Sequence, residues 1–324
     1  MERKGNIDVL RIISAIAVVT IHVVTSPVGN AVGPVSAVVM KQLNLVHNSL
    51  MWAVPVFFMI TGYCLVNKKE CTYEYCFRHV SKYAATLFTV GFFYAILELV
   101  FQSHRFSFKI LGTAIINVVG GKLWEHMWFV YAIMGVYLVM PVLHHFMKRE
   151  KKDIIILTGL LFLFTIILPF CGNWFVVGID FPFGGYLFYV CFGGCVARLG
   201  FSRKISIGIY IMSIVAMIYI IIVGKTETYD YKSIEVALMA MGIFCAMAGL
   251  KMKQNEFVRM VAECTWGIYL LHPLFINITV KVMKIDLLRG TPYLNLILFE
   301  LIIVIVSFIC TYILKKLPLL KRMF

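Results

Sequence analysis

Three ionisable side chains lie inside the first apolar stretch of the chain, where a buried charge is unfavourable. The stretch runs from Ile7 to Thr25 and contains Asp8, Arg11 and His22. In a helix that turns by about 100° per residue, the three side chains fall on one stripe and point into one shared space. Histidine titrates near neutral pH, so His22 could take the proton of a hydroxyl group and make that group nucleophilic.

The different depths of the arginine and the histidine indicate different tasks. Arg11 and His22 are separated by ~16 Å along a helix axis. Asp8 is too far from His22 to orient it, so we expect Asp8 to position Arg11. A structural explanation also exists, in which Asp8 and Arg11 form an interfacial pair and His22 is a hydrogen-bonded core residue. We expect Arg11 and His22 to open onto a single polar tunnel that begins at the cytosol.

A second polar group stands at the start of a later apolar stretch. It consists of Glu125, His126, Trp128 and Tyr131. An aromatic belt at the membrane interface explains Trp128 and Tyr131 well, but it explains the glutamate and the histidine less well. The predicted topology places this group on the extracytoplasmic side, and we predict that all four residues face a substrate there.

A third polar group lies near the end of the chain, where Thr265, Tyr269 and His272 share one helical face. Packing between helices with internal hydrogen bonds explains this face as well as a functional site does. We predict that Tyr269 and His272 line the same substrate cavity as the second group.

A fourth group, Tyr75, Arg78 and Lys82, is spaced to lie on one face of a helix that begins in a charged loop. The pattern alone favours an ordinary basic cytoplasmic loop. The two cations could also hold phosphate groups, because arginine and lysine are the usual phosphate ligands in proteins.

The composition requires a membrane. The chain has 324 residues, of which 61% are hydrophobic and 14% charged, too few charges for the surface of a soluble domain. Apolar segments of about 18 residues or more can cross a bilayer as helices. We predict an all-α polytopic membrane protein that forms a single domain over residues 1–324, with ten transmembrane helices. The predicted segments are 7–26, 48–66, 81–101, 126–146, 154–171, 183–200, 205–223, 234–250, 263–283 and 293–315.

The segment 106–121 decides the predicted orientation. If this segment does not span, roughly two-thirds of the lysine and arginine residues lie on the side of both termini, as the positive-inside rule requires. If the segment spans, the bias is reversed. We therefore predict that it lies at the surface or re-enters the membrane, and that both termini are cytoplasmic.

Two other function classes are not indicated. The net charge of +14 is explained by cations at the cytoplasmic ends of helices, and no basic stripe interleaved with aromatic residues indicates nucleic-acid binding. The nine cysteines lie mostly in apolar segments, where cysteine is commonly a small buried residue, and no CxxC pair or metal-ligand cluster predicts a metal site.

Taken together, the polar groups resemble the motifs of the acyltransferase-3 family of membrane O-acyltransferases. The first-helix motif reads Asp8-Val9-Leu10-Arg11, followed after ten residues by His22. An aromatic pair leads to Thr61-Gly62-Tyr63, where the family usually has serine in place of the threonine. The remaining two motifs are His126-Met127-Trp128-Phe129 and Tyr269-Leu270-Leu271-His272. They occur in family order and cover nearly the whole chain.

The resemblance implies transfer of an acyl group, commonly acetyl, from cytoplasmic acetyl-CoA to a hydroxyl acceptor at or beyond the membrane. The predicted catalytic residues are His22, as the base, together with Arg11 and Asp8. The predicted acetyl-CoA-binding residues are Arg11, Arg78 and Lys82. The predicted substrate-binding residues are Glu125, His126, Trp128, Tyr131, Tyr269 and His272. The group that stabilises the oxyanion stays open among Thr61, Tyr269 and backbone amides.

Within the family, the chain looks most like the membrane half of the VanT-type membrane-bound serine racemases that accompany vancomycin-resistance genes. This resemblance implies a bacterial plasma membrane and a possible cytoplasmic racemase domain after the membrane domain. It also keeps open an alternative function, a transporter for serine or another small amino acid. The acceptor could be a wall polymer, an amino acid or a peptide.

Overall fold

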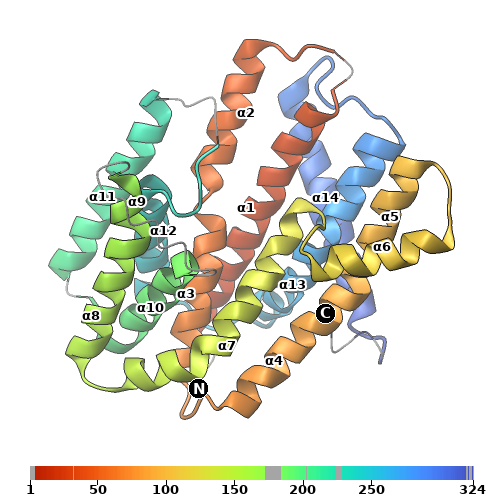
Figure 1. The fold of residues 1–324 in the computed structure, drawn as a ribbon. Coiled ribbons are helices and arrows are strands. Elements are labelled where there is room, and N and C mark those ends of the chain that lie inside the picture. The colour runs from red at the N-terminus through yellow and green to blue at the C-terminus, as the bar shows by residue number, and fades with distance from the viewer. Residues whose placement is uncertain are drawn as a thin grey trace.

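The computed structural model is built from helices throughout the residues that it describes, which are 4–31, 33–171, 184–201, 203–223, 228–318, 320 and 323. Most of the helices run side by side as a bundle (Figure 1). The helices are α1 Gly5–Gly29, α2 Ala37–Leu50, α3 Ala53–Val66, α4 Tyr73–Thr86, α5 Phe92–Ser103, α6 Phe108–Val119, α7 Trp128–Lys148, α8 Lys151–Phe162, α9 Leu168–Phe170, α10 Gly184–Leu199, α11 Arg203–Val223, α12 Ile234–Gly249, α13 Glu256–Asn277 and α14 Pro292–Leu314.

Short irregular turns join some of these helices into longer ones. A π-helical turn over Leu87–Gly91 connects α4 to α5, and another over Leu163–Ile167 connects α8 to α9. A third π-helical turn, Ile278–Val282, extends α13. A 3₁₀ turn over Glu125–Met127 leads into α7. Such π-helical turns are frequent near functional sites, and the first and third of them lie next to the site described below.

Seven helical segments of the described chain are long and apolar enough to cross a membrane. They are Gly5–Gly29, Ala37–Val66, Tyr73–Ser103, Glu125–Lys148, Lys151–Phe170, Lys204–Val223 and Pro292–Leu314. The helices α10 and α12 have 16 residues each, and α13 is not among the seven. The all-helical membrane fold is therefore confirmed, whereas the count of ten spans stays a prediction.

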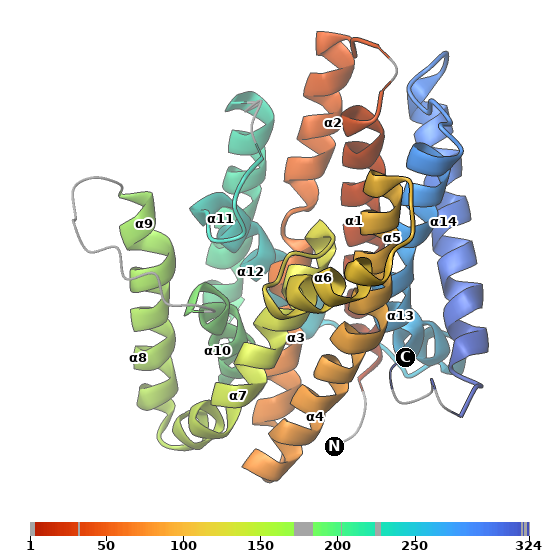
Figure 2. The ribbon, with the colours of Figure 1, turned by 45° about the vertical axis from the view of Figure 1, so that its right-hand side comes forward.

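The segment predicted not to span forms α6, which has 12 residues. At 1.5 Å per residue it extends about 18 Å, short of the ~30 Å of hydrocarbon. Figure 2 shows α6 lying across the direction of the long helices, beside α5. This geometry agrees with the prediction that the segment lies at the surface or re-enters.

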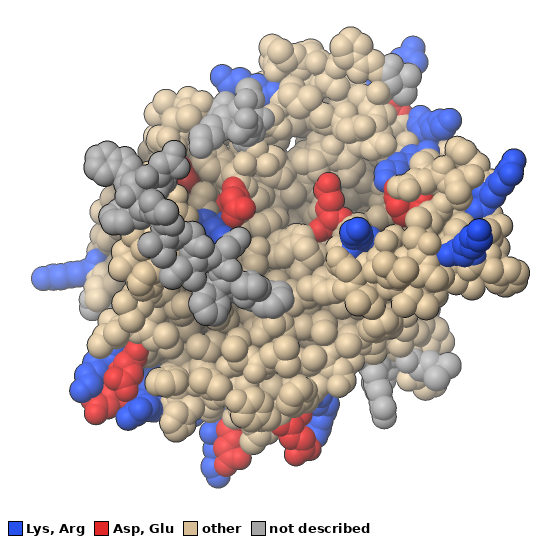
Figure 3. Space-filling view, viewed as in Figure 1, with Lys and Arg blue, Asp and Glu red and all other residues tan. Residues whose placement is uncertain are grey.

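The start of α1 and the end of α14 lie toward the same end of the bundle. Lys4 precedes α1 there, and α14 finishes there at Leu314, so we call this end the lower end, as it is drawn in Figures 1 and 2. The opposite end, where α1 reaches Gly29 and α14 begins at Pro292, is the upper end. On the face shown in Figure 3, a largely uncharged band separates charged side chains at the lower edge from those in the upper half. Which end faces the cytoplasm stays a prediction.

Glycines let two pairs of helices approach closely. A Cβ atom added at Gly62 of α3 would lie 1.8 Å from the Val190 carbonyl oxygen of α10, and one at Gly193 would lie 1.9 Å from the Met59 carbonyl oxygen. At Gly267 of α13 an added Cβ would meet the side chain of α14 Thr311 at 2.2 Å. Close approach through small residues is how membrane helices gain packing contacts without a hydrophobic driving force.

The helix α1 holds the central position that the site needs. It packs against α2, α3, α12, α13 and α14, and Figure 1 shows it inside the bundle. Its buried residues include Asp8 and Ser14. Because α1 is surrounded by helices, its polar stripe faces protein and internal space instead of lipid.

We predict that Gly62→Ala destabilises the protein by about 3 kcal/mol, the upper part of the range for overpacking. The atom that a new methyl group would meet is a backbone oxygen, so α3 and α10 would have to separate. The matched control is Gly159→Ala in α8, where an added Cβ meets nothing within 4 Å. Thermal unfolding in detergent should show a lower Tm for the first variant only, and equal Tm values would contradict the close packing.

Candidate functional site

Three histidines from separate parts of the chain meet inside the bundle. His22 comes from α1, His126 from the turn before α7, and His272 from α13. The ring centroids lie 5.0 Å apart for His22 and His272, 5.9 Å for His126 and His272, and 6.4 Å for His22 and His126. The sequence predicted all three as site residues, and the structure brings them together.

Hydrogen bonds to carbonyl groups fix this cluster. The hydroxyl of Tyr269 donates to the carbonyl oxygen of His126, which ties α13 to the start of α7. The hydroxyl of Tyr94 in α5 donates to the carbonyl oxygen of Leu270 at 2.7 Å. Pro273, the next residue after His272, lacks an N–H group, so it cannot donate the usual helical hydrogen bond to the carbonyl oxygen of Tyr269.

A cavity of about 560 Å³, the upper cavity, opens from the histidines toward the upper end. It is lined among others by His22, Glu125 and His126. His22 is partly exposed in it, whereas the buried Nε2 atom of His126 has no hydrogen-bond partner among the described residues. The upper cavity therefore presents two imidazoles to a ligand.

A charged and aromatic cluster forms one wall of the upper cavity. The indole nitrogen of Trp124 donates to Glu98 at 2.9 Å, and the Lys281 ammonium lies 3.5 Å from the same carboxylate. The ring of Trp124 stacks on Tyr94 with centroids 4.2 Å apart. Because these partners hold it, Glu98 keeps a defined position on α5.

A second cavity, the lower cavity, has a volume of about 330 Å³. Its cations are Arg11, Lys68 and Lys82, and its lining also includes Thr61 and Tyr75. The Lys68 ammonium lies 3.6 Å from the centroid of the Tyr75 ring, a cation–π contact that holds the lysine in place. The lower cavity is therefore a cationic space of the kind that attracts phosphate groups.

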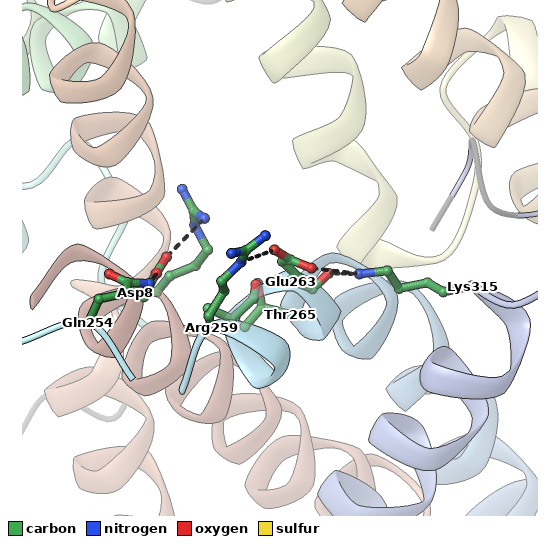
Figure 4. Close-up of polar contacts among 8 residues, drawn as sticks. Asp8, Gln254, Arg259, Glu263, Thr265 and Lys315 are labelled. Carbon is green, nitrogen blue, oxygen red and sulfur yellow. Dashed lines mark hydrogen bonds and ion pairs between the residues drawn. The ribbon is translucent and has the colours of Figure 1, made fainter. Parts of the chain in front are cut away.

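Asp8 and Arg11 form an ion pair, which both the functional prediction and the structural explanation expected. The Arg11 guanidinium lies 3.7 Å from the buried Asp8 carboxylate. The side-chain amide of Gln254 donates to the same carboxylate at 3.0 Å, and Figure 4 shows Asp8 and Gln254 side by side. A carboxylate buried this deeply needs such partners, and the arrangement directs Arg11 into the lower cavity.

One carboxylate, that of Glu263, also borders the lower cavity. Arg259 approaches it to 3.1 Å and Lys315 to 3.7 Å, as Figure 4 shows. Because two cations already neutralise this carboxylate, it does not cancel the positive charge of the three cavity cations.

The two cavities are separate, so the expected single tunnel is not what the structure shows. Arg11 and Val18 line the lower cavity and His22 lines the upper one, and no described residue lines both. On α1 the boundary falls between Val18 and His22, which is a single turn or about 6 Å. Beside it, Tyr269 lines the lower cavity while its hydroxyl holds the backbone of His126.

Two of the predicted substrate-binding residues, Trp128 and Tyr131, line neither the upper nor the lower cavity. Trp128 lies against the rings of Tyr186 and Tyr231, with centroids 5.3 Å and 5.2 Å away. The hydroxyl of Tyr131 donates to the carbonyl oxygen of Val118. Both therefore contribute to helix packing and lie outside the lining of either cavity.

Two more predicted residues lie elsewhere than expected. Arg78, predicted to bind acetyl-CoA, pairs with Glu74 at 3.1 Å on the exposed surface of α4 and does not line the lower cavity. His272, predicted to bind substrate, is 0% exposed and lines neither cavity. It lies behind His22 as seen from the upper cavity.

The residues that sequence reasoning missed at the cavities include Lys68 in the lower one, and Glu98, Trp124 and Lys281 in the upper one. Lys68 belongs to a basic loop, where charge is expected without any site. The other three come from distant parts of the chain, and their only signal was that Glu98 is an acidic residue inside an apolar segment.

A comparison with protein families decides the assignment. A family model described as an acyltransferase domain matches residues 4–316, nearly the whole chain. The chain belongs to the acyltransferase-3 family. No curated protein and no solved structure matches the chain.

Membership of the acyltransferase-3 family, together with the apolar helices, makes the chain a membrane acyltransferase domain. The resemblance to the VanT-type racemases is not tested by the family match and stays a prediction. The family match covers the histidine cluster and both cavities.

We predict that the two cavities are reached from opposite sides of the membrane. Ser26 lines the upper cavity and the native Cys64 lines the lower one. In the Ser26→Cys protein, a membrane-impermeant thiol reagent should modify residue 26 from one side only and Cys64 from the other side only. Mass spectrometry of the peptides reads each site in right-side-out and inverted vesicles.

The buried Cys245 is the internal control and should stay unmodified while the protein is folded. Modification of both residue 26 and Cys64 from the same side would contradict the arrangement of the cavities.

Proposed function

We propose that the chain transfers an acyl group from acyl-CoA, bound in the lower cavity, to a hydroxyl acceptor in the upper cavity. One observation carries this proposal. A cationic cavity and a histidine-lined cavity lie on opposite sides of a thin layer formed by His22, Tyr269 and the backbone of His126. A transferase that works across a membrane needs this arrangement, because donor and acceptor come from different sides.

The donor side is supported by the charges of the lower cavity. Arg11, Lys68 and Lys82 would hold the phosphates of the donor, and the lower end would face the cytoplasm, where acyl-CoA is found. Arginine offers paired donors in a plane, and lysine adds a compact charge. The rest of the lining is largely apolar and aromatic, which suits the pantetheine arm. Acetyl is the acyl group that the family resemblance favours.

The acceptor side is supported by His22. Its imidazole takes the proton of the acceptor hydroxyl while the hydroxyl oxygen forms a bond to the thioester carbonyl carbon. The tetrahedral intermediate then breaks its C–S bond, and the CoA sulfur leaves with the proton that His22 held. The ester product and free CoA account for all atoms, and His22 returns to its starting state.

The polar wall of the upper cavity supports a hydroxyl-bearing acceptor. Glu98, Lys281 and Trp124 combine hydrogen-bonding groups with a flat aromatic surface. Glu125 and His126 lie on the same cavity and would help orient the acceptor. A wall polymer, an amino acid and a peptide all carry suitable hydroxyl groups.

The separation of the cavities also favours a second candidate, the transport of serine or another small amino acid by alternating access. Reconstituted vesicles distinguish the two functions. Accumulation of labelled serine without any acyl-CoA supports transport, whereas release of CoA only when an acceptor is present supports the transferase.

We predict that His22→Ala lowers the rate of acceptor-dependent CoA release by about 10²–10⁴-fold, the usual contribution of a general base. The measurement is thiol release from acetyl-CoA by protein in vesicles. Donor affinity should stay within about twofold of the unchanged protein, because His22 lies outside the lower cavity. Transfer at the unchanged rate would exclude His22 as the base.

We predict that Lys68→Ala and Lys82→Ala each weaken acetyl-CoA binding by about tenfold, the loss of one charge-assisted contact. Both variants should also reduce the salt dependence of binding. The matched control is Lys152→Ala, which removes an exposed lysine that pairs with Glu150. Calorimetry in detergent measures all three, and unchanged affinity in both cavity variants would contradict the assignment of the donor site.

The Arg78→Ala variant distinguishes two expectations for donor binding, one from the sequence spacing and one from the structure. The sequence spacing predicts weaker donor binding in this variant, whereas the exposed pairing of Arg78 with Glu74 predicts no change. The same calorimetric titration separates the two predictions.

A further inference from the structure

His22 and His272 are in direct contact through specific ring nitrogens. The Nε2 atom of His272 lies 3.2 Å from the Nδ1 atom of His22. The same Nδ1 atom lies 2.8 Å from the carbonyl oxygen of Val18, one turn earlier in α1. On the other ring, the Nδ1 atom of His272 lies 3.0 Å from the carbonyl oxygen of Ile268.

These contacts determine where the protons are. A carbonyl oxygen only accepts hydrogen bonds, so each Nδ1 atom that faces one must carry the hydrogen. His22 is therefore protonated on Nδ1 and donates to Val18, and His272 is protonated on Nδ1 and donates to Ile268. In a neutral imidazole the other nitrogen then has a lone pair, so Nε2 of His272 is an acceptor that faces the Nδ1–H group of His22.

The two alternative proton arrangements are unfavourable. If neutral His272 carried its proton on Nε2, the lone pair of its Nδ1 atom would face the Ile268 oxygen, and two acceptors would lie 3.0 Å apart. If His272 carried both protons, a cation that is 0% exposed would stand in the bundle, and the lone pair of His22 Nδ1 would face the Val18 oxygen. Burial of an uncompensated charge costs several kcal/mol.

We propose that His272 is the positioning residue of His22, because its Nε2 lone pair accepts the Nδ1–H group of His22 and so leaves Nε2 of His22 as the base. This inference rests on the proposed function, in which His22 takes the acceptor proton. It assigns His272 a role in the dry interior of the protein, in place of contact with the substrate.

The contact matters most at the moment of proton transfer. When Nε2 of His22 takes the proton of the acceptor hydroxyl, the ring becomes an imidazolium and its Nδ1–H group becomes a stronger donor. The lone pair of His272 and the carbonyl oxygen of Val18 both accept from this group, so the new positive charge is stabilised where it forms. When the CoA sulfur takes the proton back, both rings return to their starting state and no net charge is left.

The rest of the structure keeps His272 in this orientation. Its Nδ1 atom donates to Ile268 within α13, which sets the plane of the ring. Two hydrogen bonds tie the same stretch of α13 to its neighbours: Tyr94 of α5 donates to the carbonyl oxygen of Leu270, and Tyr269 of α13 donates to the carbonyl oxygen of His126 in the turn before α7. A ring with one fixed tautomer and no exposed surface suits a residue that orients another one.

The tautomer can be tested without any activity measurement. Protein labelled with ¹⁵N on the histidine rings is studied by solid-state NMR in lipid, and the His22→Ala protein identifies the signals of His22. We expect a protonated Nδ1 and an unprotonated Nε2 for His22 in the resting protein. The reversed assignment, with the proton on Nε2 of His22, would overturn the proposal.

Two variants of His272 test the consequence for the reaction. His272→Gln keeps an acceptor, because its amide oxygen can reach the position of Nε2, whereas His272→Leu fills similar space without one. We expect kcat to fall about tenfold or more in the leucine variant, because one hydrogen bond to the transition state is lost. The KM for acetyl-CoA should stay within about twofold. The glutamine variant should restore most of the loss in kcat.

The control is His145→Leu, which removes an exposed histidine in the last turn of α7 that lines neither cavity. It should leave kcat within about twofold. Equal losses in the leucine and glutamine variants, or no loss in the leucine variant, would overturn the role of His272. If the leucine variant does not fold, the glutamine variant and the NMR assignment still decide.

Failure of this proposal and failure of the proposed function give different results. If His22→Ala transfers acyl groups at the unchanged rate, the proposed function fails. If His22→Ala is inactive while His272→Leu is as active as the unchanged protein, the proposed function stands and only the positioning role fails.

Discussion

Burial of three imidazole rings in an apolar bundle is the constraint on which the rest of the site depends. A ring N–H group in such surroundings must find an acceptor, and the nearest acceptors are helix carbonyl groups. Val18 and Ile268 provide them for His22 and His272. In the proposed arrangement these bonds leave the Nε2 atoms of His22 and His272 as lone-pair sites. The basic character of the site is therefore a result of how the helices satisfy their polar groups.

The need of buried polar groups for hydrogen-bond partners also explains why only a thin layer of residues separates the two cavities. Tyr269 and His126 hold each other through a backbone carbonyl, and Val18 and His22 are one turn apart on α1. This layer lies between two cavities of about 330 Å³ and 560 Å³. In the proposed reaction only the thioester end of the donor has to reach His22 through this layer. The nucleotide part can stay with the cations of the lower cavity.

The site residues that could be predicted from the sequence are ionisable side chains in or next to apolar segments. Such side chains are unfavourable in a membrane unless they have a function or a partner. His22 and His272 could be identified because histidine is rare in apolar helices, and His126 because an aromatic belt does not explain it. The stripe on α1 predicted that Asp8 would hold Arg11. The fold class follows from the same physics, since long apolar segments allow little except helices.

Side-chain direction at the edge of a helical face could not be predicted. Arg78 stands three residues after Tyr75 and four before Lys82, so its spacing allows it to join them. Glu74, one turn earlier, pairs with it on the outer surface instead. Similarly, Trp124 and Trp128 are both near the second histidine, and only the folded chain shows that Trp124 lines the cavity while Trp128 packs against Tyr186.

The charges of the two cavities differ in a way that fixes the direction of the proposed reaction. In the lower cavity Arg11, Lys68 and Lys82 face a carboxylate, Glu263, that Arg259 and Lys315 already neutralise, so the described lining favours a polyanion.

In the upper cavity the carboxylates of Glu98 and Glu125 stand with the ammonium groups of Lys122 and Lys281, so the described charges balance. A donor with several phosphates is therefore attracted to the lower cavity and gains nothing in the upper one. An uncharged hydroxyl group has no such preference and is selected by hydrogen bonds alone. In the proposed reaction the two cavities thus keep donor and acceptor apart by charge until they meet at the histidines.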